Sequence, residues 1–180
     1  RQPRRTACKA CNQALDGECF VKLSIEYILC ARCGHLNGAY EDTDAFCDAV
    51  YTNDDGASYA KNYSADDQEA YHARVCDIYS PKAEFLHKAL TELGETPESL
   101  TFSDFGAGSG YMVAAMRKLG CQDTTGYEVS RAQTSLAEAM IEPGAVVFHA
   151  LDATTELAEN SAADVITMIG VLEHLQKPRD

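Results

Sequence analysis

The chain has 180 residues, of which 46% are hydrophobic, and its 28 acidic residues against 15 basic ones give a formal net charge of −13. An acidic protein repels a phosphate backbone, so nucleic acid is disfavoured as a partner. No apolar run approaches the roughly 18 residues that a membrane helix needs, so we expect no membrane association either.

Two CxxC pairs mark residues 1–40, which we predict to form a small zinc-ribbon-like β module. The four cysteines are Cys8, Cys11, Cys30 and Cys33. The 18 residues between the two pairs are typical of a four-cysteine zinc site. Alternating segments at 20–23 and 26–29 predict a β ribbon between the pairs. A closed set of four thiolates leaves no open position for chemistry, so the predicted role of the Zn²⁺ ion is structural.

Two alternatives apply to this cluster. His35 follows the second pair and could replace one of the cysteines, and either CxxC could act as a dithiol redox pair. The remaining cysteines are scattered singly and are predicted to be small buried hydrophobic residues: Cys19, Cys47, Cys76 and Cys121. This arrangement differs from a secreted disulfide framework, so it indicates a reducing compartment and a cytoplasmic location.

Residues 41–80 are predicted to be a connecting segment that contains helical structure. A short helix is expected at about 45–50, and apolar residues return at helical spacing from residue 66. Ser80-Pro81 predicts a break in that pattern, because serine can cap a helix and proline can occupy a first turn. We therefore expect two helices, at about 66–79 and 81–93.

Strands and helices are predicted to alternate from residue 100 onward. The expected strands are 100–104, 123–128, 145–148 and 163–169, the expected helices are 110–119 and 131–140, and another helix should begin after the last strand. Alternation of this kind predicts an α/β fold in which a Rossmann-like parallel sheet carries helices on its faces.

A glycine-rich loop joins the first of these strands to its helix. Gly106, Gly108 and Gly110 lie in the stretch after Asp104, where glycine allows a sharp turn and close approach to a ligand. A dinucleotide fingerprint would need a third glycine at position 111, which is Tyr111. The loop is therefore GxGxG, which disfavours a nicotinamide-dependent enzyme.

The acid followed by GxGxG resembles the first motif of the class I S-adenosylmethionine (SAM)-dependent methyltransferases. This resemblance implies that SAM binds over the loop, with Asp104 and the three glycines contributing to the site. It also implies that Glu128, at the end of the next strand, binds the ribose hydroxyls, for which a carboxylate is suited. Asp152 matches the acid near the adenine amino group, and the amide of Ala153 lies nearby in the family.

The resemblance covers about residues 81–180, which would be the N-terminal part of a methyltransferase domain. The family's sheet has seven strands ordered 3-2-1-4-5-7-6, and this sequence supplies the first four, so we expect the sheet to be truncated after the fourth. The segment after that strand contains Glu173 and His174, which we take as catalytic candidates. His174 is the best visible base, because its pKa suits proton transfer near neutrality. The alternative is that His174 caps or packs the start of its helix.

A cysteine module upstream of this domain resembles the arrangement in nucleotide-sugar C-methyltransferases. The predicted function is therefore SAM-dependent methylation of a small molecule, such as a nucleotide sugar or another metabolite. Two alternatives stay open: an rRNA methyltransferase whose zinc module grips RNA, and a non-catalytic module that binds SAM or zinc.

Overall fold

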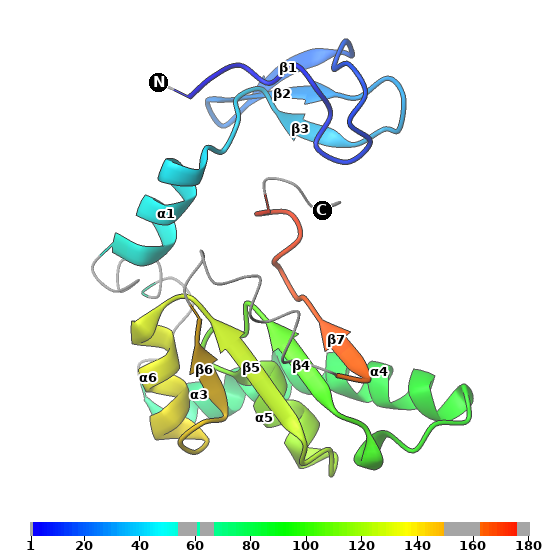
Figure 1. Ribbon diagram of the computed structural model, residues 1–180, viewed down its shortest axis with the longest axis vertical. Helices are drawn as coiled ribbons and strands as arrows, with labels where there is room; N and C mark the ends of the chain where they lie inside the picture. Colours follow the sequence, from blue (N-terminus) through cyan, green and yellow to red (C-terminus); the bar gives the residue numbers. More distant parts are fainter. Residues whose placement is uncertain (1, 54–60, 62–66, 150–162, 176–180) are drawn as a thin grey trace. The chain divides into compact units, whose positions relative to one another are not determined.

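The computed structural model describes residues 2–53, 61, 67–149 and 163–175 (Figure 1). It divides into two compact units, one formed by Arg1–Cys47 with Leu172–Asp180 and the other by Asp48–Val171. We call these the cysteine unit and the sheet unit and describe each by itself. The predicted domain boundaries at residues 40 and 80 stay predictions. No helix in the described ranges has the length and apolar character needed to cross a bilayer.

The cysteine unit contains a three-stranded antiparallel sheet in the order β1-β2-β3. Its strands are β1 (Cys19–Lys22), β2 (Ile25–Leu29) and β3 (Leu36–Gly38). Leu23 and Ser24 connect β1 to β2 with φ angles of 50° and 64°, the left-handed backbone of a two-residue hairpin turn. The predicted β module is confirmed, and β3 is an additional strand. Helix α1 (Asp44–Thr52) follows, in the region where a short helix was expected.

A continuous helical run precedes the parallel sheet and corrects the prediction of a break at residue 80. It consists of α3 (Gln68–Arg74), a π-helical turn η2 (Val75–Tyr79) and α4 (Ser80–Glu92). Pro81 lies in the first turn of α4 as expected, but Ser80 is itself helical and its side chain caps nothing. Ser80 N donates to Val75 O, five residues back. This wider spacing absorbs the loss of a donor at the proline without breaking the helix.

The sheet unit is built on four parallel strands in the order β6-β5-β4-β7. The strands are β4 (Phe102–Phe105), β5 (Thr124–Glu128), β6 (Val146–Phe148) and β7 (Val165–Thr167). Helices α5 (Tyr111–Lys118) and α6 (Arg131–Met140) connect them, and a short turn η3 (Pro97–Ser99) precedes β4. The Rossmann-like α/β prediction is confirmed. Residues 172–174 form a turn rather than the helix start expected there.

The register of the sheet decides which side chains face the helices. Asp104, Gly126 and Val146 are paired across three strands, and Val146 packs in one buried cluster with Val113 of α5 and Ala137 of α6. The described helices therefore cover this face of the sheet.

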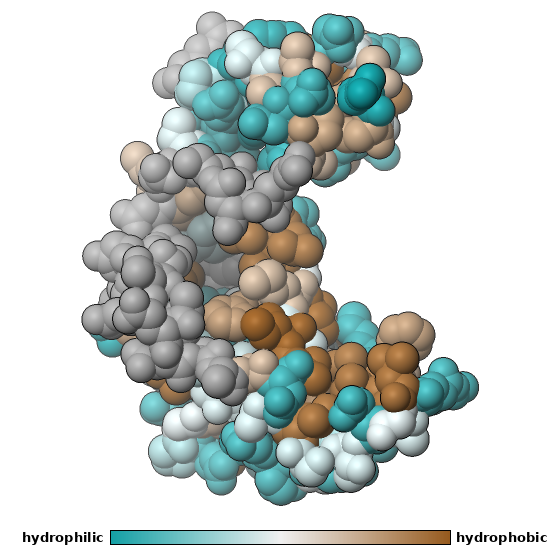
Figure 2. Space-filling model, turned by 45° about the vertical axis from the view of Figure 1, so that its right-hand side comes forward, coloured by the Kyte–Doolittle hydropathy of each residue, from teal (hydrophilic) through white to brown (hydrophobic). Residues whose placement is uncertain are grey.

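The next row of the sheet, Phe105, Tyr127 and Val147, points the other way because side chains alternate along a strand. Val147 and Ile166 on that face are 42% and 55% exposed. Apolar surface is visible on the sheet unit in Figure 2. The described residues thus leave the opposite face of this parallel sheet with little cover.

The single cysteines differ from one another in burial. Cys121 is fully buried in the core beside Phe102 and Met116, as predicted. Cys19 and Cys76 are exposed, so the prediction is wrong for both of them. Cys19 lies on β1, all four residues of which are exposed, and Cys76 lies on the outer side of η2, where Lys118 Nζ donates to its sulfur.

We expect Gly126→Ala to destabilise the sheet unit. A Cβ atom there would lie 2.6 Å from Ala107 Cβ and 2.9 Å from Val146 Cγ2, closer than packed side chains tolerate. Overpacking of this kind lowers the free energy of unfolding by about 1–3 kcal/mol, measurable by urea denaturation followed by circular dichroism. Gly38→Ala is the control, because its new Cβ would meet nothing closer than 3.9 Å. Equal stability of the two variants would contradict the close packing of β5 against the loop.

Candidate cofactor site and thiolate cluster

The loop between β4 and α5 is shaped by three glycines in the left-handed region (Figure 1). Gly106, Gly108 and Gly110 have φ angles of 67°, 55° and 74°. Residues with a Cβ adopt this conformation at a cost, and here they would also collide with neighbours. A Cβ at Gly106 would lie 2.5 Å from Val171 Cγ2, and one at Gly108 would lie 2.8 Å from Gln133 Oε1. Both the backbone and the packing therefore require the GxGxG pattern.

Glu128 lies at the end of β5, where the sequence placed it, and its carboxylate holds the loop. The residue is 7% exposed. Glu128 Oε2 accepts from Gly108 N at 2.8 Å, and Oε1 accepts from Val129 N and Ser130 N at 2.9 Å each. One carboxylate thus ties the glycine loop to the start of α6. Three hydrogen bonds leave it capacity to accept at least one more, since two carboxylate oxygens offer about four lone-pair positions.

Asp104 is a second carboxylate beside the loop, and it is almost completely buried. It is 4% exposed, and Thr167 Oγ1 of β7 donates to its Oδ1 at 2.6 Å. Burial is the main cause that raises the pKa of Asp104 to about 6, the nearby charge of Glu128 raises it further, and the Thr167 hydrogen bond opposes both. No ion pair joins Asp104 to a cation within the described ranges. The site is therefore electrostatically suited to a positively charged group.

Three tyrosines pack beside the loop, and sequence reasoning missed all of them. Tyr111, the first residue of α5, has ring centroids 4.8 Å from Tyr71 and 5.2 Å from Tyr79. Tyr71 is buried and donates from its hydroxyl to Ser109 O at 3.0 Å, which fixes α3 against the loop. The available signal was the spacing of two tyrosines on one helical segment and a third directly after GxGxG.

Arg74 brings a positive charge to this aromatic group. Its guanidinium carbon lies 5.1 Å from the centroid of the Tyr111 ring, within range of a cation–π interaction. Its Nε is buried and has no hydrogen-bond partner among the described residues. The π-helical turn that begins directly after Arg74 places Tyr79 on the same ring.

The structure does not test the roles of the other predicted site residues. Asp152 and Ala153 lie outside the described residues, so their assigned roles stay predictions. Glu173 and His174 are exposed in the turn at 172–174, which belongs to the cysteine unit. The main-chain oxygen of Glu173 accepts from Lys9 Nζ at 2.8 Å. Their catalytic roles also stay predictions.

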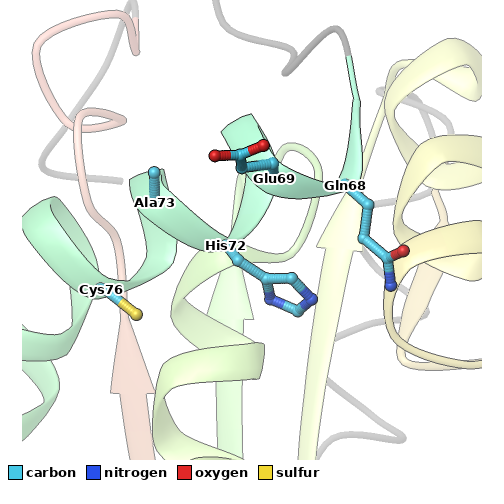
Figure 3. Close-up of a pocket in the computed structure, with 5 residues that line it drawn as sticks. All are labelled: Gln68, Glu69, His72, Ala73 and Cys76. Carbon is cyan, nitrogen blue, oxygen red and sulfur yellow. The ribbon is translucent and has the colours of Figure 1, made fainter.

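A shallow depression on the sheet unit lies along the outer side of α3 and η2 (Figure 3). It is lined by Gln68, Glu69, His72, Ala73 and Cys76. His72 and Cys76 project to the same side in Figure 3, one helical turn apart. Tyr71 and Val75, from the same helical run, are instead buried. The side of the run that contacts the loop is thus the buried one, and the depression is a separate, open surface.

The cysteine unit brings its four predicted ligands together. The four Sγ atoms of Cys8, Cys11, Cys30 and Cys33 all lie within 4.8 Å of one another. Two of the separations, Cys8 to Cys33 and Cys11 to Cys30, are 3.7 Å. A tetrahedron with Zn–S bonds of about 2.3 Å has edges of about 3.8 Å, whereas a disulfide needs about 2.05 Å. The spacing therefore suits tetrahedral coordination, and His35 is not part of the group.

The two CxxC turns have the same backbone hydrogen bonds. Asn12 N donates to Cys8 O at 2.8 Å, and Gly34 N donates to Cys30 O at 2.9 Å. Both donors are left-handed, with φ angles of 57° and 75°. Glycine adopts this conformation readily, and asparagine is among the residues that tolerate it. Two matching knuckles thus present their sulfurs to a common centre.

The thiols of the cluster differ in how readily they ionise. Although burial raises the pKa of Cys8, hydrogen bonds from the amides of Cys11 and Ala10 and from Asn37 lower it to about 6. The pKa of Cys33 is raised to about 12: its backbone hydrogen bond from His35 lowers it, but burial and the three neighbouring cysteines outweigh that bond. Four thiolates cannot coexist at this distance without a cation between them.

The fold and the glycine loop define a Rossmann-like nucleotide-binding type of domain, and a comparison of families agrees with it. Residues 72–180, more than half of the chain, match the family described as methyltransferase domain. The chain therefore belongs to this family. None of the curated proteins matches the sequence significantly.

One solved structure shows the same fold at low identity, and two others align less closely. The plantazolicin methyltransferase BpumL in complex with SAH aligns with a TM-score of 0.50 and 17% identity, over 73% of this chain and 48% of that chain. BpumL with a monoazolic desmethylPZN analog and SAH gives 0.48 and 20%, over 74% and 49%. A Thermoplasma acidophilum protein, 1320, gives 0.38 and 18%, over 56% and 53%. The chain thus spans about half the length of these proteins.

The burial of Asp104 predicts a pH dependence of stability. An aspartate in the unfolded chain has a pKa near 3.9, against about 6 in the fold. The Asp104 carboxyl therefore ionises less readily in the folded state than in the unfolded chain. Its contribution to the free energy of unfolding falls as the pH rises from about 4 to 6. The loss amounts to about 3 kcal/mol, because one pKa unit corresponds to about 1.36 kcal/mol.

We accordingly expect Asp104→Asn to gain about 3 kcal/mol relative to the unmodified protein between pH 4 and pH 7. Urea denaturation at several pH values measures this. Asp164→Asn is the control with the opposite sign, because hydrogen bonds from Thr101 lower the pKa of Asp164. That variant should lose stability relative to the unmodified protein as the pH rises toward about 4 and should show no further change between pH 4 and pH 7. A pH-independent difference for Asp104→Asn would contradict the burial of a neutral acid.

Proposed function

We propose that this chain binds SAM at the loop 106–110 and supplies the cofactor-binding part of a methyltransferase that acts on a small molecule. The observation that carries the proposal is the left-handed glycine loop hydrogen-bonded to Glu128 at the end of the neighbouring strand. In open parallel sheets, ligands bind outside the carboxyl ends of the strands, where these groups lie. The SAH complex of BpumL, a methyltransferase with this fold, supports the same choice of cofactor.

The charges around the loop support SAM over a dinucleotide. SAM carries a positive sulfonium and a positive amino group, which two carboxylates attract. Asp104 and Glu128 would instead repel the pyrophosphate of a nicotinamide dinucleotide. Methyltransferases also need little from their own side chains beyond alignment, since bound SAM supplies an activated methyl group. The loop, Glu128 and the tyrosines serve such alignment, because they are rigidly interlocked.

The proposed acceptor is a small molecule such as a nucleotide sugar or another metabolite. The net charge of −13 supports this over an rRNA substrate, because a strongly acidic surface opposes RNA binding. Glu173 and His174 are retained as the candidates for proton transfer, should the acceptor need to lose a proton. A cytoplasmic location also stays a prediction.

We further propose Zn²⁺ as the ion of the thiolate cluster, with a structural role. Four soft thiolates in tetrahedral spacing favour zinc over hard cations such as magnesium or calcium. All four positions are occupied by protein ligands, which leaves none for a substrate. The ion would hold the two knuckles in place.

Replacement of Glu128 tests the cofactor site. In the full-length protein, Glu128→Ala should weaken SAM binding by about 1–3 kcal/mol, the scale for losing hydrogen bonds to a charged group. Calorimetric titration with SAM measures this, and parallel titrations with NAD and RNA test the two competing assignments. Because Glu128 also holds the loop, melting without SAM identifies any general loss of folding. Glu138→Ala, at an exposed position of α6, is the charge-matched control. Undiminished affinity in Glu128→Ala would overturn the proposed site.

Elemental analysis tests the metal. The purified protein should contain one zinc per chain, and Cys30→Ser combined with Cys33→Ser should remove it, because two of four ligands are lost. Cys19→Ser with Cys76→Ser is the matched control, since both of these cysteines are exposed and outside the cluster. Unchanged zinc in the first double variant would show that the metal binds elsewhere.

A further inference from the structure

Asn37 is a buried polar residue in the middle of β3 whose side-chain hydrogen bonds all lie around the thiolate cluster. It is 2% exposed. Its Oδ1 accepts from Lys9 N at 2.9 Å, and its Nδ2 donates to His35 O at 3.0 Å and approaches Cys8 Sγ at 3.6 Å. The orientation of the amide is determined by its partners, because a main-chain N–H can only donate and a carbonyl can only accept.

These three contacts join the two knuckles. Lys9 lies inside the first CxxC turn, directly after Cys8. His35 closes the second turn, where its carbonyl also accepts from Cys30 N at 2.9 Å. Asn37 therefore connects the first turn, through Lys9, to the second turn, through His35, and its side chain also touches Cys8 Sγ.

We propose that Asn37 is the positioning residue of the metal site: it holds the two knuckles in ligating register and donates a hydrogen bond to the Cys8 thiolate. This inference rests on the proposed zinc site. Four thiolates around Zn²⁺ leave a net charge of −2 in a partly buried centre, and a donor aimed at sulfur disperses part of that charge. Residues that hydrogen-bond to metal ligands in this way fix the ligand's orientation and raise affinity for the ion.

Packing alone does not explain an asparagine at this position. Asn37 is paired with Ile28, which is 4% exposed, so its neighbour on β2 is an apolar core residue. An aliphatic side chain of similar size would bury there without the free-energy cost of desolvating an amide. Asparagine is favourable because each of its polar atoms finds a partner at the cluster.

Two variants separate the parts of this role. Asn37→Asp keeps the volume and the acceptor for Lys9 N, but loses both donations from Nδ2, to His35 O and to Cys8 Sγ, and adds a negative charge beside the cluster. Asn37→Leu keeps the approximate volume and loses all three contacts. We expect both to weaken zinc binding by about 10- to 100-fold in competition with a chromophoric chelator. Gln2→Leu is the control in the same unit, since it removes an amide acceptor for Thr43 that does not touch the cluster.

Cobalt substitution reports on the sulfur itself. Loss of the N–H···S bond raises the energy of the sulfur lone pairs, so the thiolate-to-Co²⁺ charge-transfer band should move to lower energy in both Asn37 variants and stay unchanged in Gln2→Leu. A general loss of stability would not shift that band. If Asn37→Leu fails to fold with excess zinc, the zinc affinity and the cobalt spectrum of Asn37→Asp decide whether the proposal holds.

The outcomes distinguish failure of this inference from failure of the proposed zinc site on which it rests. If Asn37→Asp binds zinc with the parent protein's affinity and has the parent's cobalt spectrum, the proposed role of Asn37 is overturned, and the proposed zinc site is unaffected. Equal weakening by Gln2→Leu would also overturn it. A parent protein that binds neither zinc nor cobalt would overturn the proposed metal site, and the inference with it.

Discussion

The contact between Gly108 N and Glu128 Oε2 joins the ends of two neighbouring strands, and much of the sheet unit is arranged to permit it. The loop can reach Glu128 because its glycines turn in the left-handed region. The loop can also lie on β5, because Gly126 has no side chain where Ala107 approaches. Tyr71 then anchors the other side of the loop through Ser109. The candidate site is thus mainly a backbone conformation, held by one carboxylate, one missing Cβ and one hydroxyl.

The same arrangement gives the site its electrostatic character. Asp104 and Glu128 come from adjacent strands and are both buried, and the charge of Glu128 raises the pKa of Asp104. Arg74 lies over the Tyr111 ring, at the start of the helix that follows the loop. A bound cation would relieve the repulsion between the carboxylates. The proposed affinity for a positively charged cofactor and the free-energy cost of ionising Asp104 would therefore have one origin.

The sequence predicted the parts of the fold that depend on local patterns. Helix α6 spans the predicted residues 131–140, and Ser130 caps its start by accepting from Gln133 N. The glycines were recognised as a GxGxG pattern after a predicted strand, and Glu128 was singled out by the resemblance to SAM-dependent methyltransferases. The π-helical turn was not predicted. Its spacing depends on Pro81 and also on the packing of Tyr71 and Tyr79 against Tyr111, which is a tertiary contact.

Strand β3 was missed for a related reason. A strand of three residues is too short to show an alternating pattern of polar and apolar residues. Its pairing with β2 also depends on a contact between Asn37 and Lys9, which are distant in the sequence. The exposure of Cys19 and Cys76 could not be predicted from the local sequence either, because the burial of a cysteine depends on the side of the helix or strand on which it lies.

The cysteine unit has few means of stability other than its thiolate cluster. Its buried apolar side chains are few, namely Cys8, Ile28, Cys30 and Ala39, and two of these are ligands. Along one face of its sheet, Phe20 and Ile25 are 39% and 52% exposed, so that face contributes little apolar burial in the described residues. A three-stranded sheet with so small a core is marginal on hydrophobic burial alone. The free energy of binding an ion at the four sulfurs would therefore be, for the most part, the free energy that folds this unit.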